Sequence, residues 1–382
     1  MFKLSPHNTA KKLFAILTPM FVTRREIPKR NHVLDGLRGY AALMVAVGHS
    51  FITIKNNSKI DGIIYQLVNG GVAVSIFFLL SGYVLGESLR KNDTRLTITK
   101  SVRFYIKRIF RIYPIFLLQI ILLSIFLLFW SYQRFPGMSH WTSYWFNFPI
   151  SVKEVLFNLV FRSTSLGGVT WTLKVEMIGS LFIPIFFYFS SRTNKYMDLC
   201  IIVFIATLGY MFPISKGVTY LYVFYIGLVL PKWKENFQNI KLTKKSADII
   251  IIGLFGFALF ISATTIDVQY PFVRHIPLTL FLGALIYIPT KHVALVLTSR
   301  LFQLLGRISY SFYLFHFLVL YVMLRFMFRY IDNGLLQRHF LFFEFMIATS
   351  SLFITIFISR FLYRYIEEPC IILGRKAINV VR

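Results

Sequence analysis

Long apolar runs recur along this chain, and they constrain its fold more than any other feature. Each run approaches the length of about 20 residues that an α-helix needs to cross the hydrocarbon core of a bilayer. The composition agrees, because only 15% of the residues are charged, whereas soluble domains are about 25% charged. The sequence therefore predicts an all-α integral membrane protein. We expect about ten transmembrane helices, at residues 36–54, 66–88, 112–130, from 167 onward, 198–214, 217–231, 248–264, 276–290, 306–328 and 343–364.

The basic residues are unevenly distributed between these runs. The formal net charge is +27, which on a soluble protein would indicate nucleic-acid binding. Most of the 42 Lys and Arg residues instead fall at the two ends and in every second connection, which is typical of cytoplasmic segments. We therefore expect a multi-pass protein of the cell membrane with both termini cytoplasmic, contacting membrane lipids and not nucleic acid. The basic segments are residues 1–39, 90–111, 191–197, 232–247, 291–307 and 364–382.

The same pattern divides the chain into three parts. Residues 1–33 form a basic cytoplasmic arm whose apolar run, 13–22, is too short to span a bilayer. We expect this arm to lie on the membrane surface. Residues 34–370 form the ten-helix membrane domain, which ends where Glu367, Glu368 and Pro369 stop the last helix, because Pro cannot continue one. Residues 371–382 are a cytoplasmic tail.

The first run carries ionisable residues at both ends. Asp35 and Arg38 lie at its start and His49 near its far end. Arg38 and His49 are eleven positions apart, which on a helix is about three turns and ~16 Å along one face. Ionisable residues within a membrane span usually have a function. The alternative is that Asp35 and Arg38 mark the helix mouth and His49 the opposite rim.

Two further segments combine charge with apolar surroundings. Arg108 and Arg111 share a helical face in the basic segment before the third run. They either anchor the chain at lipid head groups or clamp a phosphate-bearing substrate, because Arg binds phosphate oxygens in a bidentate way. Glu176 lies in the apolar run that opens at Gly167, so it is either functional or part of a salt bridge between helices.

A polar stripe follows the start of the ninth run. Ser309, Tyr313 and His316 recur at intervals of three or four residues and so share one helical face. A polar stripe on an apolar span points toward a cavity or a partner helix. In the second run, Gly82 and its neighbouring glycines permit close helix packing.

Six pieces of the chain, taken in order, resemble the motifs of one family. They are LDGLRG with the Arg38–His49 spacing, FFLLSGY, the Arg108–Arg111 pair, WTLKVE, GRISYSFYLFH and YRYIEEP. Together they resemble the membrane acyltransferase-3 family, whose members are integral membrane O-acyltransferases that modify glycans. The resemblance covers residues 34 to about 370, and the chain is similar to stand-alone members without an extracellular hydrolase-like domain. Ser75 departs from the pattern, since many members carry an acidic residue there.

The resemblance implies transfer of an acyl group, most often acetyl from acetyl-CoA, to a hydroxyl of a cell-envelope glycan or lipid-linked glycan, without a metal. It implies that Arg38, Arg108 and Arg111 hold the CoA phosphates, and that His49 is catalytic, as general base or transient acyl carrier. Glu176 is the second catalytic candidate, through orientation of His49 or contact with substrate. The residues expected to line the substrate cavity are Asp35, Ser75, Ser81, Trp171, Tyr313 and His316.

A second function class fits the same buried charges. A transporter or flippase of a lipid-linked sugar or another anion would use them to bind its cargo. Such proteins are commonly built from inverted repeats with paired broken helices, and the chain has no clear repeat of this kind. Dependence on acyl-CoA distinguishes the two classes.

Overall fold

The computed structural model of the chain describes residues 31–55, 59–91, 95–130, 135–145, 150–212, 216–264 and 272–378. Within these ranges the regular structure is helical, and the β-pairing is one isolated bridge between Ile54 and Met138. The predicted all-α class is therefore confirmed for the described part of the chain. The proposed surface arm, up to residue 30, and residues 379–382 lie outside it.

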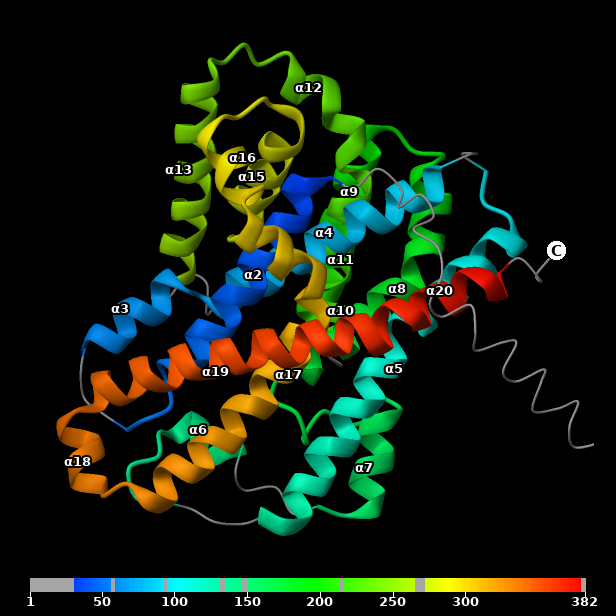
Figure 1. Cartoon of the computed structure of the whole chain (residues 1–382). Coiled ribbons are helices and arrows are strands. Elements are labelled where there is room, and N and C mark those ends of the chain that lie inside the picture. Colours follow the sequence, from blue (N-terminus) through cyan, green and yellow to red (C-terminus); the bar gives the residue numbers. More distant parts are fainter. Residues whose placement is uncertain are drawn as a thin grey trace, which may run out of the picture. The chain divides into compact units, whose positions relative to one another are not determined.

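The helices follow the predicted apolar runs in order (Figure 1). Their bounds are α2 His32–Ser50, α3 Lys59–Leu67, α4 Gly70–Arg90, α5 Ile98–Trp130, α6 His140–Trp145, α7 Val152–Leu159, α8 Thr170–Ser190, α9 Lys195–Met211, α10 Lys216–Thr219, α11 Leu221–Val229, η2 Leu230–Trp233, α12 Lys234–Gln238, α13 Lys244–Ser262, α15 His275–Tyr287, α16 His292–Leu297, α17 Arg300–Tyr330, α18 Asn333–Arg338, α19 Phe340–Leu362, η3 Tyr363–Glu367 and α20 Glu368–Ala377.

Six helical segments of the described chain are long and apolar enough to cross a membrane. They are α4, α5, α8, α13, α17 and the continuous segment from α19 to α20. The chain is thus a multi-pass membrane protein. The other four predicted runs form α2, α9, α10 with α11, and α15, which are shorter or less apolar than these six. The count of ten crossings stays a prediction.

The basic segment at 90–111 is not simply a connection. Helix α5 begins at Ile98 and continues through Pro114 to Trp130, so Arg108 and Arg111 lie within it. The helix starts early because apolar residues alternate with the basic ones there, and long basic side chains lay their stems along apolar surface. Phe110 is one such residue, and it packs directly against Gly374 of α20.

The predicted stop at Glu367–Pro369 is wrong. A π-helical turn, Tyr363–Glu367, links α19 to α20, and the helical path continues to Ala377 (orange to red in Figure 1). Pro369 falls in the first turn of α20, where a missing N–H is tolerated because the first N–H groups of a helix have no partner within it. A π turn therefore lets the helix resume beyond the proline.

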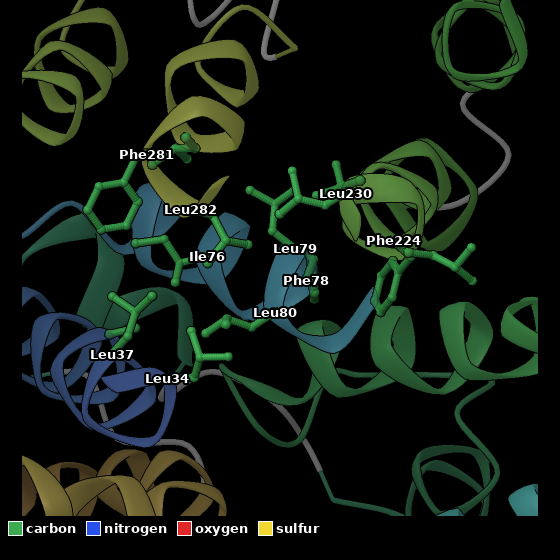
Figure 2. Close-up of a cluster of buried hydrophobic side chains, with 14 of the residues drawn as sticks. Leu34, Leu37, Ile76, Phe78, Leu79, Leu80, Phe224, Leu230, Phe281 and Leu282 are labelled. Carbon is green, nitrogen blue, oxygen red and sulfur yellow. The ribbon is translucent and has the colours of Figure 1, made fainter. Parts of the chain in front are cut away.

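Close glycine contacts hold α2 and α4 against their neighbours. A Cβ built on Gly306 of α17 would lie 2.0 Å from the carbonyl oxygen of Asp35 in α2. Likewise a Cβ on Gly82 of α4 would lie 2.1 Å from the carbonyl oxygen of Phe224 in α11. The backbones thus touch, as the glycines of the second run predict. Around α4, side chains of α2, α11 and α15 form the largest hydrophobic core (Figure 2), which includes Leu34, Leu37, Ile76, Phe78, Leu79, Leu80, Phe224, Leu230, Phe281 and Leu282.

Candidate active site

Two histidines from distant parts of the chain meet where α2 ends. His49 Nδ1 lies 3.0 Å from His316 Nε2, and the two rings stack with centroids 5.3 Å apart. His316 Nδ1 lies 2.6 Å from the carbonyl oxygen of Tyr313 in the preceding turn of α17. The close contact of α2 with α17 at Gly306 thus brings together the far end of the first run and the polar stripe of the ninth.

The carbonyl oxygen determines the tautomers of both neutral rings. A carbonyl oxygen only accepts hydrogen bonds, so His316 Nδ1 carries the hydrogen and His316 Nε2 is the bare nitrogen. His316 Nε2 therefore accepts, and His49 Nδ1 donates to it. The remaining nitrogen, His49 Nε2, keeps a lone pair that can take a proton or attack a carbonyl carbon.

Two tyrosines in and beside the polar stripe join α17 to α8 and α5. Tyr313 is hydrogen-bonded through its hydroxyl to Thr172 Oγ1 at 2.9 Å. One turn earlier, the Tyr310 hydroxyl donates to the carbonyl oxygen of Ile112 at 2.6 Å. Ser309 instead donates to the carbonyl oxygen of Gly306 in its own helix. The stripe thus meets a partner helix, α8, through Tyr313, as its polarity predicts, and Tyr310 beside it bonds α5.

The basic candidates gather nearer the start of α2. Arg108 Nη2 donates to Glu176 Oε1 at 2.6 Å, and Arg108 Nε donates to Ser180 Oγ at 3.0 Å. Arg38 contacts Asp35 at 3.4 Å, and its charge interacts with those of Arg108, Arg111 and Glu176. All three predicted arginines therefore share one charged cluster with two carboxylates, and an oxyanion brought here meets several N–H donors.

The connection before α8 is held by its own polar network. The Glu154 carboxylate accepts hydrogen bonds from Ser163, at 2.5 Å, and from Ser165, and these bonds lower the pKa of Glu154. Asn158 Oδ1 accepts from the backbone N–H of Leu166 at 3.3 Å. The residues that precede Gly167 are therefore fixed where α8 begins.

Comparison with known proteins identifies the family. The model of the Acyltransferase domain family, acyltransferase-3, matches residues 31–364. The chain belongs to the acyltransferase-3 family. The family expected from the motifs is thus confirmed. No solved structure matches the chain significantly.

Curated relatives of this acyltransferase carry compatible names. "Putative O-acetyltransferase SACOL0978" of Staphylococcus aureus (strain COL) is 25% identical over 377 residues, covering 91% of this chain and 58% of the relative. "Acyltransferase MdmB" of Streptomyces mycarofaciens is 32% identical over 112 residues, 28% of this chain and 27% of the relative. "Nodulation protein 10" of Rhizobium leguminosarum bv. viciae is 23% identical over 186 residues, 46% of this chain and 48% of the relative. The chain thus spans only 58% of the length of the first of these.

Three predicted cavity residues of the acyltransferase do not join the histidine pair. Ser75 Oγ lies 2.9 Å from His275 Nε2, in a separate network of α4, α11 and α15. The Trp171 ring lies 6.3 Å from the ring of Tyr220, beside that network. Ser81 is partly exposed on α4. His275 itself is buried.

Glu176 contacts a different partner from the one expected of an orienting group. Its carboxylate binds Arg108, and the ring that contacts His49 Nδ1 is that of His316. Among the described residues, His, Cys, Asp and Glu side chains form no group of three that could hold a metal ion.

Sequence reasoning missed three residues in and around this site. Trp141 of α6 lies 5.1 Å from the His49 ring and lines a small apolar cavity with Phe317. Thr172 bonds Tyr313, and Gln119 is a buried amide on α5. Gln119 had a signal, because it is the single amide in the apolar run 112–130. Trp141 and Thr172 are ordinary residues of their segments, and only the fold brings them to the site.

Proposed function

We propose that this acyltransferase is an O-acyltransferase that moves an acyl group, most simply acetyl, from acyl-CoA at the cytoplasmic face to a hydroxyl of a cell-envelope or lipid-linked glycan. The observation that carries the proposal is the histidine chain, which leaves His49 Nε2 with a lone pair. The family and the printed names of the relatives support the acyl-transfer part. The proposal includes a cell-membrane location, ten crossings of residues 34–370, and both termini in the cytoplasm.

The donor end of the site is the arginine cluster. Arg38, Arg108 and Arg111 supply N–H groups suited to the phosphates of CoA. Arg38 lies about 16 Å from His49 along α2, from the rise of a helix over eleven residues. The extended arm of CoA would cross this gap and present its thioester to His49. The cluster thus fixes the donor, and α2 sets the distance to the chemistry.

The transfer itself needs one basic nitrogen. The acceptor hydroxyl oxygen attacks the acyl carbonyl carbon while His49 Nε2 takes the hydroxyl proton. The positive charge that forms on His49 is stabilised through its Nδ1–H bond to His316 Nε2. The carbon–sulfur bond then breaks, and the CoA thiolate takes the proton from His49. If His49 Nε2 attacks first, the acyl group passes through an acyl-histidine and then to the hydroxyl.

The decisive experiment follows labelled acetyl from acetyl-CoA into envelope glycans in membranes that contain wild-type protein or His49→Ala. We expect label with wild type and a loss of about 10²- to 10⁴-fold in the variant, the usual contribution of a general base. His292→Ala is the matched control, because His292 is an exposed histidine on α16. Full activity of folded His49→Ala would refute the role of His49. No transfer by folded wild-type protein, with any acyl-CoA, would favour the transporter.

A further inference from the structure

One buried side-chain amide on α5 forms no hydrogen bond with the described residues. Gln119 is fully buried, and neither its Nε2 nor its Oε1 has a hydrogen-bond partner among the residues that the structure describes. Its neighbours on that helix face, Ile115, Phe116 and Leu123, are apolar. An unpaired amide in such surroundings destabilises the folded state, so its presence needs a reason other than packing.

The position of Gln119 repeats the geometry of the first span. It follows Arg108 by eleven residues on α5, as His49 follows Arg38 on α2. Each helix therefore carries an arginine and, about 16 Å farther along the same face, a polar side chain. Arg108 pairs with Glu176 in the interior of α8. Gln119, three turns farther along α5, lies near the beginning of α8.

The amide lies against the glycines that open α8. A Cβ built on Gly167 would lie 3.2 Å from Gln119 Nε2 and 2.7 Å from Thr170 Cγ2. The glycine thus lets the amide approach bare backbone. The residue before α8 is Val169, whose side chain cannot accept hydrogen bonds from the first N–H groups of this 21-residue helix. The backbone N–H groups of Thr170 and Thr172 instead donate to the carbonyl oxygens of Gly167 and Val169, so the start of α8 favours negative charge through the helix dipole.

This end of α8 is at the depth of the histidines. A Cβ on Gly168 would meet the ring of Phe317 at 2.4 Å, and Phe317 directly follows His316. Three residues into α8, Thr172 bonds Tyr313, one turn before His316. The Gln119 amide and the histidine pair therefore both lie close to the start of α8, where α5, α8 and α17 meet.

The loop that carries the glycines is rigid and folded onto α5. Phe161 adopts a left-handed φ of 58°, which is uncommon for a residue other than glycine. Its ring stacks on that of Phe116, 4.5 Å away and one turn before Gln119. Such strained residues cluster at functional sites. The loop thus fixes its backbone against the face of α5 from which the amide projects.

We propose that the Gln119 amide N–H, beside the start of α8 and its dipole, binds the carbonyl oxygen of the acyl group during transfer. This inference rests on the proposed acyl transfer. When the hydroxyl oxygen, or His49 Nε2, bonds to the carbonyl carbon, the carbon–oxygen double bond opens and the oxygen becomes negative. When the carbon–sulfur bond breaks, the double bond re-forms. Fixed donors in a site without water stabilise the intermediate oxyanion strongly, and this holds for either role of His49.

The test replaces Gln119 by residues that keep its volume and lose its donors. Gln119→Met is unbranched like glutamine, and Gln119→Leu is a second variant in case methionine packs poorly. We expect kcat for acetyl transfer to fall about 10²- to 10³-fold, the usual effect of removing one such donor. KM for acetyl-CoA and binding of CoA itself, which has no acyl carbonyl, should stay as in wild type.

Thermal stability distinguishes this role from a structural one. Removal of an unpaired buried amide should leave the melting temperature unchanged or raise it, so activity falls while stability does not. Ser124→Ala is the matched control, because Ser124 Oγ is another buried α5 group without a partner in the described chain, and it should retain wild-type kcat.

The outcomes are separable. If wild type transfers acetyl and both Gln119→Met and Gln119→Leu keep its kcat, the carbonyl site is refuted and the proposed function stands. A raised KM with unchanged kcat would also refute it, because the donors would then bind the ground state and the transition state equally. If wild type transfers no acyl group from acyl-CoA, the proposed function fails first, and the carbonyl site with it.

Discussion

The protein contains two histidine networks that differ in whether each ring nitrogen has a hydrogen-bond partner. In the network of α4, α11 and α15, the Tyr222 hydroxyl lies 2.6 Å from His275 Nδ1, and His275 Nε2 lies 2.9 Å from Ser75 Oγ. Ser75 Oγ donates onward to the carbonyl oxygen of Gly71 at 2.8 Å. Ser75 thus accepts from Nε2, Tyr222 donates to Nδ1, and every group of the His275 network has a partner.

The other network ends on an unused nitrogen. The chain from the Tyr313 carbonyl through His316 leads to His49 Nδ1, and Nε2 of His49 is not hydrogen-bonded among the described residues. His275 and His316 are both buried and His49 is half-buried, so the clearest difference between the networks is the nitrogen that His49 leaves unused. The spare ring nitrogen separates them, and it arises because the chain begins at a carbonyl oxygen that only accepts.

The largest expected effect comes from the same substitution in both networks. His49→Gln should lower kcat for acyl transfer about 10²- to 10⁴-fold, because an amide nitrogen is not a base. His275→Gln should keep the kcat of wild type per folded molecule. Both are measured with acetyl-CoA in purified, folded protein. Equal losses of kcat in the two variants would contradict this distinction and would mean that the His275 network takes part in the reaction.

Part of the geometry of these networks could be predicted from the sequence. The apolar runs predict the helices, and helical spacing places Arg38 and His49 on one face and Tyr313 and His316 on another. The meeting of His49 with His316 could not be predicted, because it joins residues 267 positions apart and depends on the backbone contact at Gly306. Without that pairing, nothing determines which of the two His49 ring nitrogens carries the hydrogen.

The differences from expectation have a similar origin. Glu176 was a candidate either to orient His49 or to form a salt bridge between helices, and it binds Arg108, because the way in which α5 and α8 pack decides which turns of the two helices meet. Gln119 is visible in the sequence as an amide in an apolar run, but whether an amide is paired is a property of its neighbours. Local patterns thus predicted helices and faces, and left the tertiary pairings open.

A smaller effect is expected at the positioning residue of the reactive network. His316→Leu removes the acceptor that holds the His49 tautomer, so kcat should fall roughly 10- to 100-fold, less than at His49, since the free ring still reaches the productive tautomer part of the time. His316→Gln offers an amide oxygen to His49 Nδ1–H and should recover part of the loss. A merely structural role for His316 would lower the melting temperature of both variants and leave kcat per folded molecule unchanged.

The smallest effect on activity, and a clear one on stability, is expected in the satisfied network. Tyr222→Phe leaves His275 Nδ1 buried without its donor, which should lower the free energy of unfolding by about 1–3 kcal/mol. Tyr196→Phe, at an exposed tyrosine of α9, should change it little. Unfolding in detergent, followed alongside acetyl transfer, measures both quantities. A loss of kcat in folded Tyr222→Phe would mean that His275 acts on the substrate. A free ring nitrogen would then not be what distinguishes His49 from His275.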